Sequence, residues 1–312
     1  MSLFCCRFKL LVSTLLLGTL LPVMVMAKPD LQRKIGVTVA DTGSHDYRFS
    51  DLRLDSADGK RHYRIRIAKP NQAPPAQGYP VVYFLDGNAV LMELNTKLLS
   101  RLAAGTHPPL LVMLGYDNDL RIDAPSRAYD YTPKPPQQAQ QKPVPMPHWP
   151  NGGADEFLQL IEQKIKPAVA AQVAVDPQRQ TLWGHSYGGV FVLHTLFNQP
   201  QAFQRYIAVE PSLWWGNGFI LKEAQAFMQQ QPGLRAQLAL WEGRRHQQER
   251  ASGDAPPAVG NASATEGTHQ LAQRLAALNG LRVDYHAWPQ QGHGGMLGAA
   301  VAPALLETSG SE

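Results

Sequence analysis

Gly184-His185-Ser186-Tyr187-Gly188-Gly189 is the stretch of this 312-residue chain that says most about its fold. Residues 180–183 before it resemble an apolar strand end, and residues 190–197 after it have the length and apolar character of a buried helix. A Gly-x-Ser-x-Gly turn between a strand and a helix is the context of a nucleophile elbow, which exposes the serine hydroxyl at the edge of a sheet. The alternative is a glycine-rich turn whose serine does no chemistry. The context favours Ser186 as a nucleophile, with the backbone N–H of Tyr187 as one oxyanion donor.

Apolar strand-like segments alternate with helix-like segments along the rest of the chain. This alternation predicts an α/β fold with a mostly parallel central sheet that is flanked by helices. Alternating apolar and charged residues in the second segment predict an N-terminal hairpin. The expected strands are 46–54, 62–69, 81–85, 110–114, 181–183, 206–209, 238–241 and 282–288, and the expected helices are 90–102, 155–173, 190–197, 218–230, 265–278 and 296–306.

A proline- and glutamine-rich insertion, residues 116–153, interrupts this alternation. We expect no regular element in it, and it is either a surface loop or one wall of a substrate cleft. Pro167 should end or kink the helix 155–173. Since nothing divides the remaining chain into two cores, residues 28–312 are expected to form a single domain.

The amino terminus has the pattern of a secretory signal peptide. Arg7 and Lys9 precede an apolar run over 10–26, and Val25-Met26-Ala27 fits the small-x-small rule for cleavage. The alternative is a membrane anchor, but a run of about 17 residues that contains a proline is at the short limit for spanning a bilayer. We therefore expect residues 1–27 to be removed and the mature protein to lie in a bacterial periplasm, without stable membrane insertion.

The composition sets further limits on function. Cys5 and Cys6, the two cysteines of the chain, lie inside the predicted signal peptide, so we expect neither a disulfide nor a thiolate metal site in the mature protein. No metal or cofactor is expected. The formal net charge of +4 falls to about +2 when Arg7 and Lys9 are removed, and no basic run suggests nucleic-acid binding.

A nucleophilic serine needs a base, and His293 is the strongest candidate. It lies between glycines after the last expected strand, and the chain order serine first, histidine last is that of α/β hydrolases. The alternative is a surface histidine in a flexible turn. A second oxyanion donor is expected from the backbone N–H of Gly87 or Asn88, directly after strand 81–85, although an ordinary Asp-Gly turn has the same sequence; Asp86 should brace this loop.

Five motifs occur in one order at particular spacings: VVYFLDGNAVL (81–91), SRAYDYTP (126–133), LWGHSYGGVFVL (182–193), EPSLWW (210–215) and QQGHGGML (290–297). Together they resemble the esterase D-type branch of the α/β hydrolases and, more narrowly, the periplasmic enterobactin/salmochelin (catecholate siderophore) trilactone esterases. The resemblance covers roughly residues 35–305. It implies that Ser186 attacks an ester of a cyclic tri-serine lactone that bears catechols, with His293 as general base and an acyl-enzyme intermediate.

Such a substrate is an anionic catecholate siderophore, which can arrive with iron bound, so its cleft should offer guanidinium groups and aromatic faces. The resemblance implies this role for Arg127, for which the alternative is an ion pair with Asp130. Trp214 and Trp215 are the aromatic candidates, and for them the alternative is packing in the core.

The sequence departs from the usual catalytic triad at the acid. Many relatives carry Asp or Glu three residues after the glycine that ends the strand at 238–241, where this chain has His246 after Gly243. The siderophore branch that it resembles uses a Ser–His dyad, so we expect Ser186 and His293 alone, with a backbone carbonyl or polar side chain orienting the imidazole. The functional alternatives are another carboxylic-ester hydrolase or acyltransferase of this fold, or a non-catalytic periplasmic siderophore-binding protein.

Overall fold

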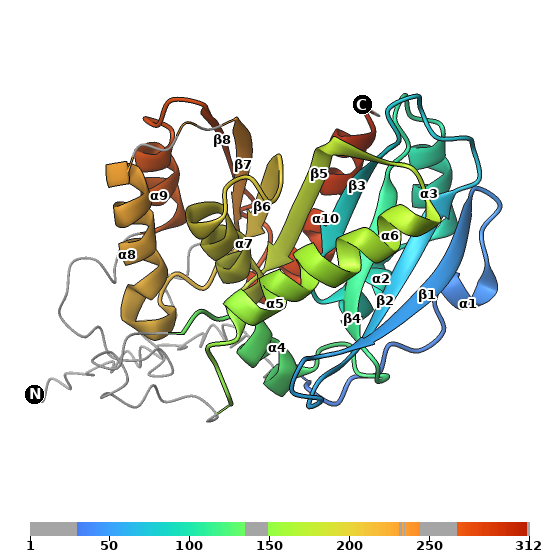
Figure 1. Cartoon of the computed structure of the whole chain (residues 1–312), viewed down its shortest axis with the longest axis horizontal. Helices are drawn as coiled ribbons and strands as arrows, with labels where there is room; N and C mark the ends of the chain where they lie inside the picture. Colours follow the sequence, from blue (N-terminus) through green and yellow to red (C-terminus); the bar gives the residue numbers. More distant parts are fainter. Residues whose placement is uncertain (1–29, 135–148, 231–232, 234, 244–266, 311–312) are drawn as a thin grey trace, which may run out of the picture. The chain divides into compact units, whose positions relative to one another are not determined.

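The computed structural model describes residues 30–134, 149–230, 233, 235–243 and 267–310 (Figure 1), and the predicted signal peptide lies outside them. They contain an eight-stranded sheet in the order β1-β2-β4-β3-β5-β6-β7-β8. Strands β3 to β8 run parallel, whereas β1 and β2 are the antiparallel hairpin at one edge. The strands are β1 (Tyr47–Asp55), β2 (His62–Pro70), β3 (Tyr79–Phe84), β4 (Leu110–Tyr116), β5 (Val175–His185), β6 (Arg205–Val209), β7 (Ala236–Glu242) and β8 (Leu281–Ala287). The predicted hairpin and mostly parallel sheet are confirmed.

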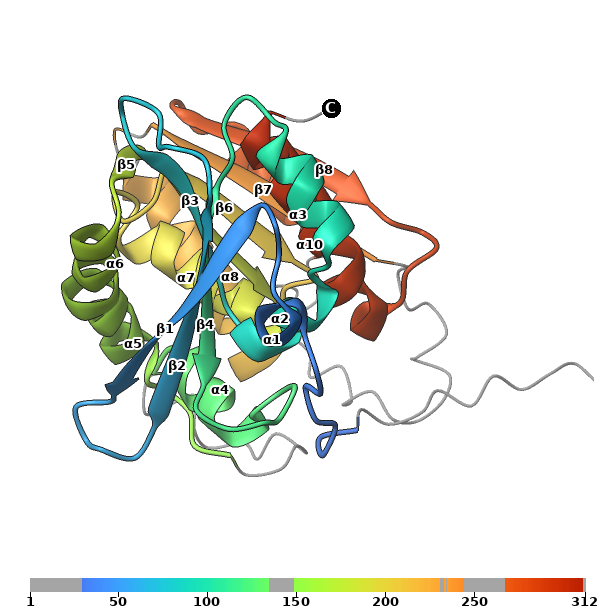
Figure 2. The same ribbon diagram turned by 90° about the vertical axis from the view of Figure 1, so that its right-hand side faces the viewer.

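Helices cover both faces of the sheet (Figure 2). One apolar cluster joins the sheet to α5 (Ala154–Leu160), α6 (Lys166–Gln172), α7 (Tyr187–Asn198), α8 (Trp215–Gln230) and α9 (Thr268–Leu275). A second cluster joins the opposite face to α1 (Val39–Thr42), α2 (Gly87–Glu93), α3 (Thr96–Ala103) and α10 (His293–Ser309). Because side chains alternate along a strand, Tyr83 of β3 packs in the first cluster and Phe84 in the second, which is why this strand is apolar throughout.

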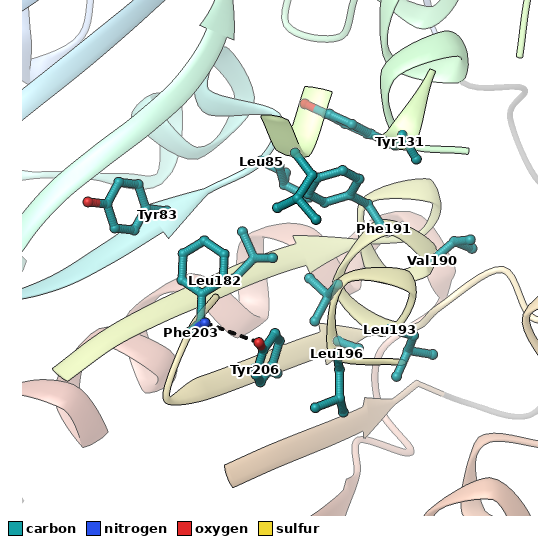
Figure 3. Close-up of a cluster of buried hydrophobic side chains, with 14 of the residues drawn as sticks. Tyr83, Leu85, Tyr131, Leu182, Val190, Phe191, Leu193, Leu196, Phe203 and Tyr206 are labelled. Carbon is teal, nitrogen blue, oxygen red and sulfur yellow. Dashed lines mark hydrogen bonds between the residues drawn. The ribbon is translucent and has the colours of Figure 1, made fainter. Parts of the chain in front are cut away.

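Helix α7, which begins just after Ser186, is anchored in the first cluster (Figure 3). Phe191 of this helix packs against Tyr131, with ring centroids 6.0 Å apart. Eleven of the twelve residues of α7 are buried, so the helix is held by packing on all sides. A buried, close-packed helix gives the elbow a rigid base.

Two of the sequence predictions need correction. The helix expected at 90–102 is broken into α2 and α3, because Asn95 adopts an extended conformation and its side chain accepts the N–H of Leu98, which caps a new helix. The insertion 116–153 contains the helix α4 (Ala124–Asp130), whose start is capped by Asp123 in the same way. Residues 135–148 of the insertion lie outside the described part of the chain.

Pro167 acts on its helix as expected. The segment 155–173 is α-helical up to Leu160, forms a π-helical turn, η2 (Ile161–Ile165), and resumes as α6 with Pro167 in the first turn. Proline lacks an N–H, and the wider turn that precedes it absorbs the interruption. Among the helices of the described residues, none combines the length and the hydropathy that a bilayer-spanning segment requires.

Candidate active site

The carboxyl end of β5 bends sharply into α7 at Ser186. Its backbone has φ 60° and ψ −114°, a conformation that is costly for any residue other than glycine. A Cβ on Gly184 would collide with the backbone of Gly188, so the turn requires glycine there. The N–H of Ser186 donates a hydrogen bond to the carbonyl of Val209, and its length of 3.0 Å is typical of such bonds. This is the geometry of a nucleophile elbow.

The side chain of His293 meets this serine. Its Nε2 lies 3.1 Å from the Oγ of Ser186, although the two residues are 107 positions apart in the chain. His293 is the first residue of α10, and 41% of its side chain is exposed, so solvent and substrate can reach it. Ser212 also contacts the nucleophile, with the two Oγ atoms 3.2 Å apart. The structure thus brings together the two residues that the sequence paired.

His185 supports the base without facing the serine hydroxyl. Its Nε2–H donates to the backbone carbonyl of His293 at 2.8 Å. Burial, followed by the nearby His293 ring and the charge of Arg127, lowers the pKa of His185 well below its ordinary value. A neutral imidazole that donates to this carbonyl fixes the backbone from which the base projects.

The loop after β3 lies beside the elbow, where the second oxyanion donor was expected. Gly87 and Tyr187 are the first residues of α2 and α7, and the first N–H groups of a helix have no partner within it. A Cβ on Gly87 would lie 2.5 Å from the backbone carbon of Met113, so only glycine fits. The side chain of Asn88 donates to three carbonyls of the segment 116–120, at 3.0 to 3.2 Å, and holds the loop in place.

Arg127 is placed differently from the expectation. Its Nε and Nη2 donate to the two carboxylate oxygens of Asp86 at 2.7 and 2.8 Å, and Nη2 also donates to the carbonyl of His185. Burial opposes the charge of Arg127, but the Asp86 carboxylate outweighs it and raises its pKa. The alternative pairing with Asp130 is wrong, since Asp130 pairs with Arg61 at 2.9 Å.

The Arg127–Asp86 pair therefore lies beneath the site and ties the oxyanion loop to the elbow strand. Only 11% of the Arg127 side chain is exposed, so the expectation that it contacts substrate is corrected: it holds Asp86 and the carbonyl of His185 in place. Asp86 itself has a left-handed φ of 52°, and its N–H donates to the hydroxyl of Tyr131. These buried, charge-assisted bonds hold a strained turn at the point where the chemistry requires it.

The two tryptophans separate into different environments. Trp214 is 41% exposed, and its ring centroid lies 6.3 Å from that of Tyr187, beside the serine. Trp215 is buried in the first apolar cluster, so the expectation that it contacts substrate is corrected to core packing. The next three residues have positive φ values, which reverse the chain before the regular part of α8. Trp214 remains as the aromatic face available to a ligand.

The sequence reasoning missed two residues that follow β6. Ser212 contacts the nucleophile, and Glu210 places its Oε1 3.9 Å from the Nδ1 of His293. Both belong to the motif Glu210-Pro-Ser212. The sequence signal that could have identified them is their position directly after β6, which is adjacent to β5, the strand that ends at the nucleophile. At the usual position of the acid, His246 lies outside the described residues.

A serine at an elbow and a histidine within hydrogen-bond distance, at the carboxyl edge of a mostly parallel sheet, define a serine ester hydrolase of the α/β-hydrolase fold. A family model described as "Putative esterase" matches residues 56–289. The chain belongs to this esterase family.

Named relatives and solved structures agree with this assignment. The chain is 38% identical to an apo-salmochelin esterase of Escherichia coli over 92% of this chain and 86% of that protein. It is 33% identical to the ferri-bacillibactin esterase BesA of Bacillus subtilis, over 81% of this chain and 86% of the relative. The solved enterobactin and salmochelin hydrolase IroE superposes with a TM-score of 0.70 at 37% identity, over 87% of this chain and 99% of IroE.

Proposed function

We propose that the protein is an exported serine esterase that hydrolyses the ester bonds of a cyclic trilactone catecholate siderophore and so aids iron release. The observation that carries this proposal is the contact between Ser186 Oγ and His293 Nε2 at 3.1 Å, at a site open to solvent. The relatives supply the substrate class, because their names include salmochelin, bacillibactin and enterobactin esterases.

Acylation begins when the Oγ of Ser186 attacks the ester carbonyl and its proton passes to the Nε2 of His293. The carbonyl oxygen becomes an oxyanion, which the backbone N–H groups of Tyr187 and of Gly87 or Asn88 stabilise; one such donor contributes about 100- to 1000-fold in rate. The C–O bond to the leaving hydroxyl then breaks, and His293 returns the proton to that oxygen. The ring is opened and its acyl part is held on Ser186.

Deacylation repeats these steps with water as the nucleophile. His293 takes a proton from water, the hydroxide attacks the acyl-enzyme, and the bond to Ser186 Oγ breaks as the proton returns to that oxygen. The product is a free carboxylic acid on a linear chain. This second half-reaction needs a base that solvent can reach, and the partial exposure of His293 provides that access.

The exposed face of Trp214 supports an aromatic substrate. Its ring lies beside Tyr187 at the mouth of the site, and a catechol can stack on such a surface. Because Arg127 is buried and paired with Asp86, we propose no direct contact between its guanidinium and the siderophore.

Export is proposed from the sequence of residues 1–27, which fits a cleaved signal peptide, and it implies action in a periplasm. The prediction is that the mature chain, purified from the periplasmic fraction, begins at Lys28. Amino-terminal sequencing tests it, and an unprocessed amino terminus in the membrane fraction would contradict it.

Product analysis tests the proposed reaction. Residues 28–312 and the same chain with Ser186→Ala are each incubated with enterobactin, with and without iron, and the products are separated by chromatography and identified by mass spectrometry. Linear trimer, dimer or monomer from the wild type alone supports a trilactone esterase. Intact lactone in both samples contradicts it; turnover of a nitrophenyl ester would then favour another esterase, and tight binding without turnover a siderophore-binding protein.

A further inference from the structure

Glu210 stands at the point where β6 ends, one strand away from the elbow. Its backbone N–H donates to the carbonyl of Trp241 at 2.7 Å, which ties the end of β6 to β7. Its φ is 45°, in the left-handed region that costs most residues energy and that persists only where the surroundings impose it. A strained backbone at a non-glycine residue on this edge of the sheet indicates that its side chain has a function.

One oxygen of the Glu210 carboxylate is hydrogen-bonded, and the other faces His293. Oε2 accepts the backbone N–H of Gly243, and Oε1 lies 3.9 Å from the Nδ1 of His293. The opposite ring nitrogen of His293 faces Ser186, so the imidazole lies between a carboxylate and the hydroxyl. Only 18% of the Glu210 side chain is exposed, which limits the screening of this charge by solvent.

Gly243 makes room for this carboxylate. A Cβ at position 243 would lie 3.0 Å from Oε2 of Glu210 and 2.7 Å from the backbone oxygen of Gln291, so a side chain there would push against both. The acid of a catalytic triad usually follows β7. In this protein the residue after β7, Gly243, instead binds the carboxylate of Glu210, which follows β6. Glu242, the adjacent carboxylate on β7, accepts a hydrogen bond from Tyr285 at 3.1 Å.

We propose that Glu210 is the positioning residue of His293 and that it takes the place of the triad acid from the neighbouring strand. This inference rests on the proposed role of His293 as the base. A carboxylate near Nδ1 favours the tautomer that carries its proton on that nitrogen, which leaves the lone pair of Nε2 directed at Ser186. It also stabilises the imidazolium that forms during acylation, because opposite charges 3.9 Å apart attract each other.

The test compares Glu210→Gln with Glu242→Gln, which makes the same chemical change at the adjacent strand end. We measure kcat and KM on enterobactin and on a nitrophenyl ester, the rate at which a fluorophosphonate probe labels Ser186, and the midpoint of thermal unfolding. In Glu210→Gln, kcat and the labelling rate fall about 100-fold with KM within about twofold of the wild type, because the amide disfavours the productive tautomer. Glu242→Gln keeps the kcat of the wild type.

Glu210→Asn is the second variant, because asparagine tolerates the left-handed backbone and secures a folded protein without the carboxylate. A folded variant of either kind whose kcat and labelling rate equal those of the wild type overturns the inference, as does an equal loss in Glu242→Gln. The probe and the nitrophenyl ester report on Ser186 whatever the natural substrate is. Failure to cleave enterobactin would therefore count against the proposed function, and an unchanged labelling rate against the role of Glu210.

Discussion

His194 and His293 both have carboxylate neighbours, and the difference between them separates a structural role from a chemical one. His194, on α7, is buried between Asp155 and Glu223, with nitrogen–oxygen distances of 3.0 and 2.9 Å. His293 is partly exposed, and its carboxylate neighbour, Glu210, lies 3.9 Å away. Burial opposes the charge of His194, but the hydrogen bonds to Asp155 and Glu223 outweigh it and raise its pKa to about 9.

A histidine with both nitrogens engaged in this way stays protonated at neutral pH and cannot accept a proton. It links α7 to α5 and α8, and so it steadies the helix that follows the nucleophile. His293 keeps one nitrogen directed at Ser186 and a solvent-exposed edge, as a base must. The hydrogen-bonded carboxylates therefore keep His194 protonated. The more distant carboxylate of Glu210 leaves His293 free to take up a proton from Ser186.

The comparison is tested most strongly by making the same substitution at both positions. We expect His293→Gln to lower kcat by about 10,000-fold, because the general base and acid is lost, while KM changes little. His194→Gln should retain kcat within about threefold, since this side chain does not touch the reacting atoms. Steady-state kinetics on enterobactin measure both, and equal losses in the two variants would contradict the assignment of roles.

The support given by His185 is expected to have a smaller effect. His185→Phe fills the space but removes the donor to the His293 carbonyl, so the base loses its fixed backbone and kcat should fall about tenfold. His185→Gln keeps an N–H donor and serves as the matched control, with a smaller loss. If both variants lose the same amount, packing rather than this hydrogen bond supports the base.

Protonation of His194 should make the free energy of unfolding depend on pH. Its pKa is raised on folding from 6.5 to about 9, so its contribution is fully present below pH 6.5 and is lost as the pH rises through 9. The contribution is on the order of 1–3 kcal/mol, because Asp155 is largely exposed and its interaction is partly screened. Urea unfolding at pH 6 and pH 9.5 should show this loss in the wild type and a smaller one in His194→Gln. An equal loss in both proteins would assign it to other groups.

The smallest expected effect is at Trp214. Replacing it by alanine removes an exposed aromatic face at the site, so KM for a catecholate trilactone should rise about three- to tenfold, which corresponds to about 1 kcal/mol. KM for a small nitrophenyl ester should stay unchanged, because that substrate does not reach the ring. Equal changes for both esters would place the effect in the fold rather than in substrate binding.

The sequence was sufficient for the parts of the fold and site that local patterns control. Apolar periodicity located the sheet, and the glycines around Ser186 and at Gly87 marked turns that only glycine can make. Breaks within helices were harder to predict from the sequence. The break at Asn95 depends on capping and the π-helical turn before Pro167 depends on packing, and apolar periodicity reports neither.

Charged side chains were the hardest to place from sequence. Arg127 was expected to meet substrate, yet it pairs with Asp86, which is 41 positions away in the chain. The two residues are close because Asp86 follows β3, Arg127 lies on the helix after β4, and β3 and β4 are parallel neighbours in the sheet. Glu210 was overlooked because the acid was sought after β7, while the parallel neighbour β6 ends at the same edge. Such pairings follow from tertiary topology, and no spacing along the chain encodes them.

The role assigned to His293 is to make Ser186 a nucleophile. The most direct measurement treats the wild type, Ser186→Ala and His293→Gln with DFP, the serine hydrolase inhibitor present in a solved IroE complex, followed by peptide mapping by mass spectrometry. We expect one adduct, on Ser186 of the wild type, none on Ser186→Ala, and labelling of His293→Gln that is slower by orders of magnitude. An adduct on another residue, or equal labelling of the wild type and His293→Gln, would contradict it.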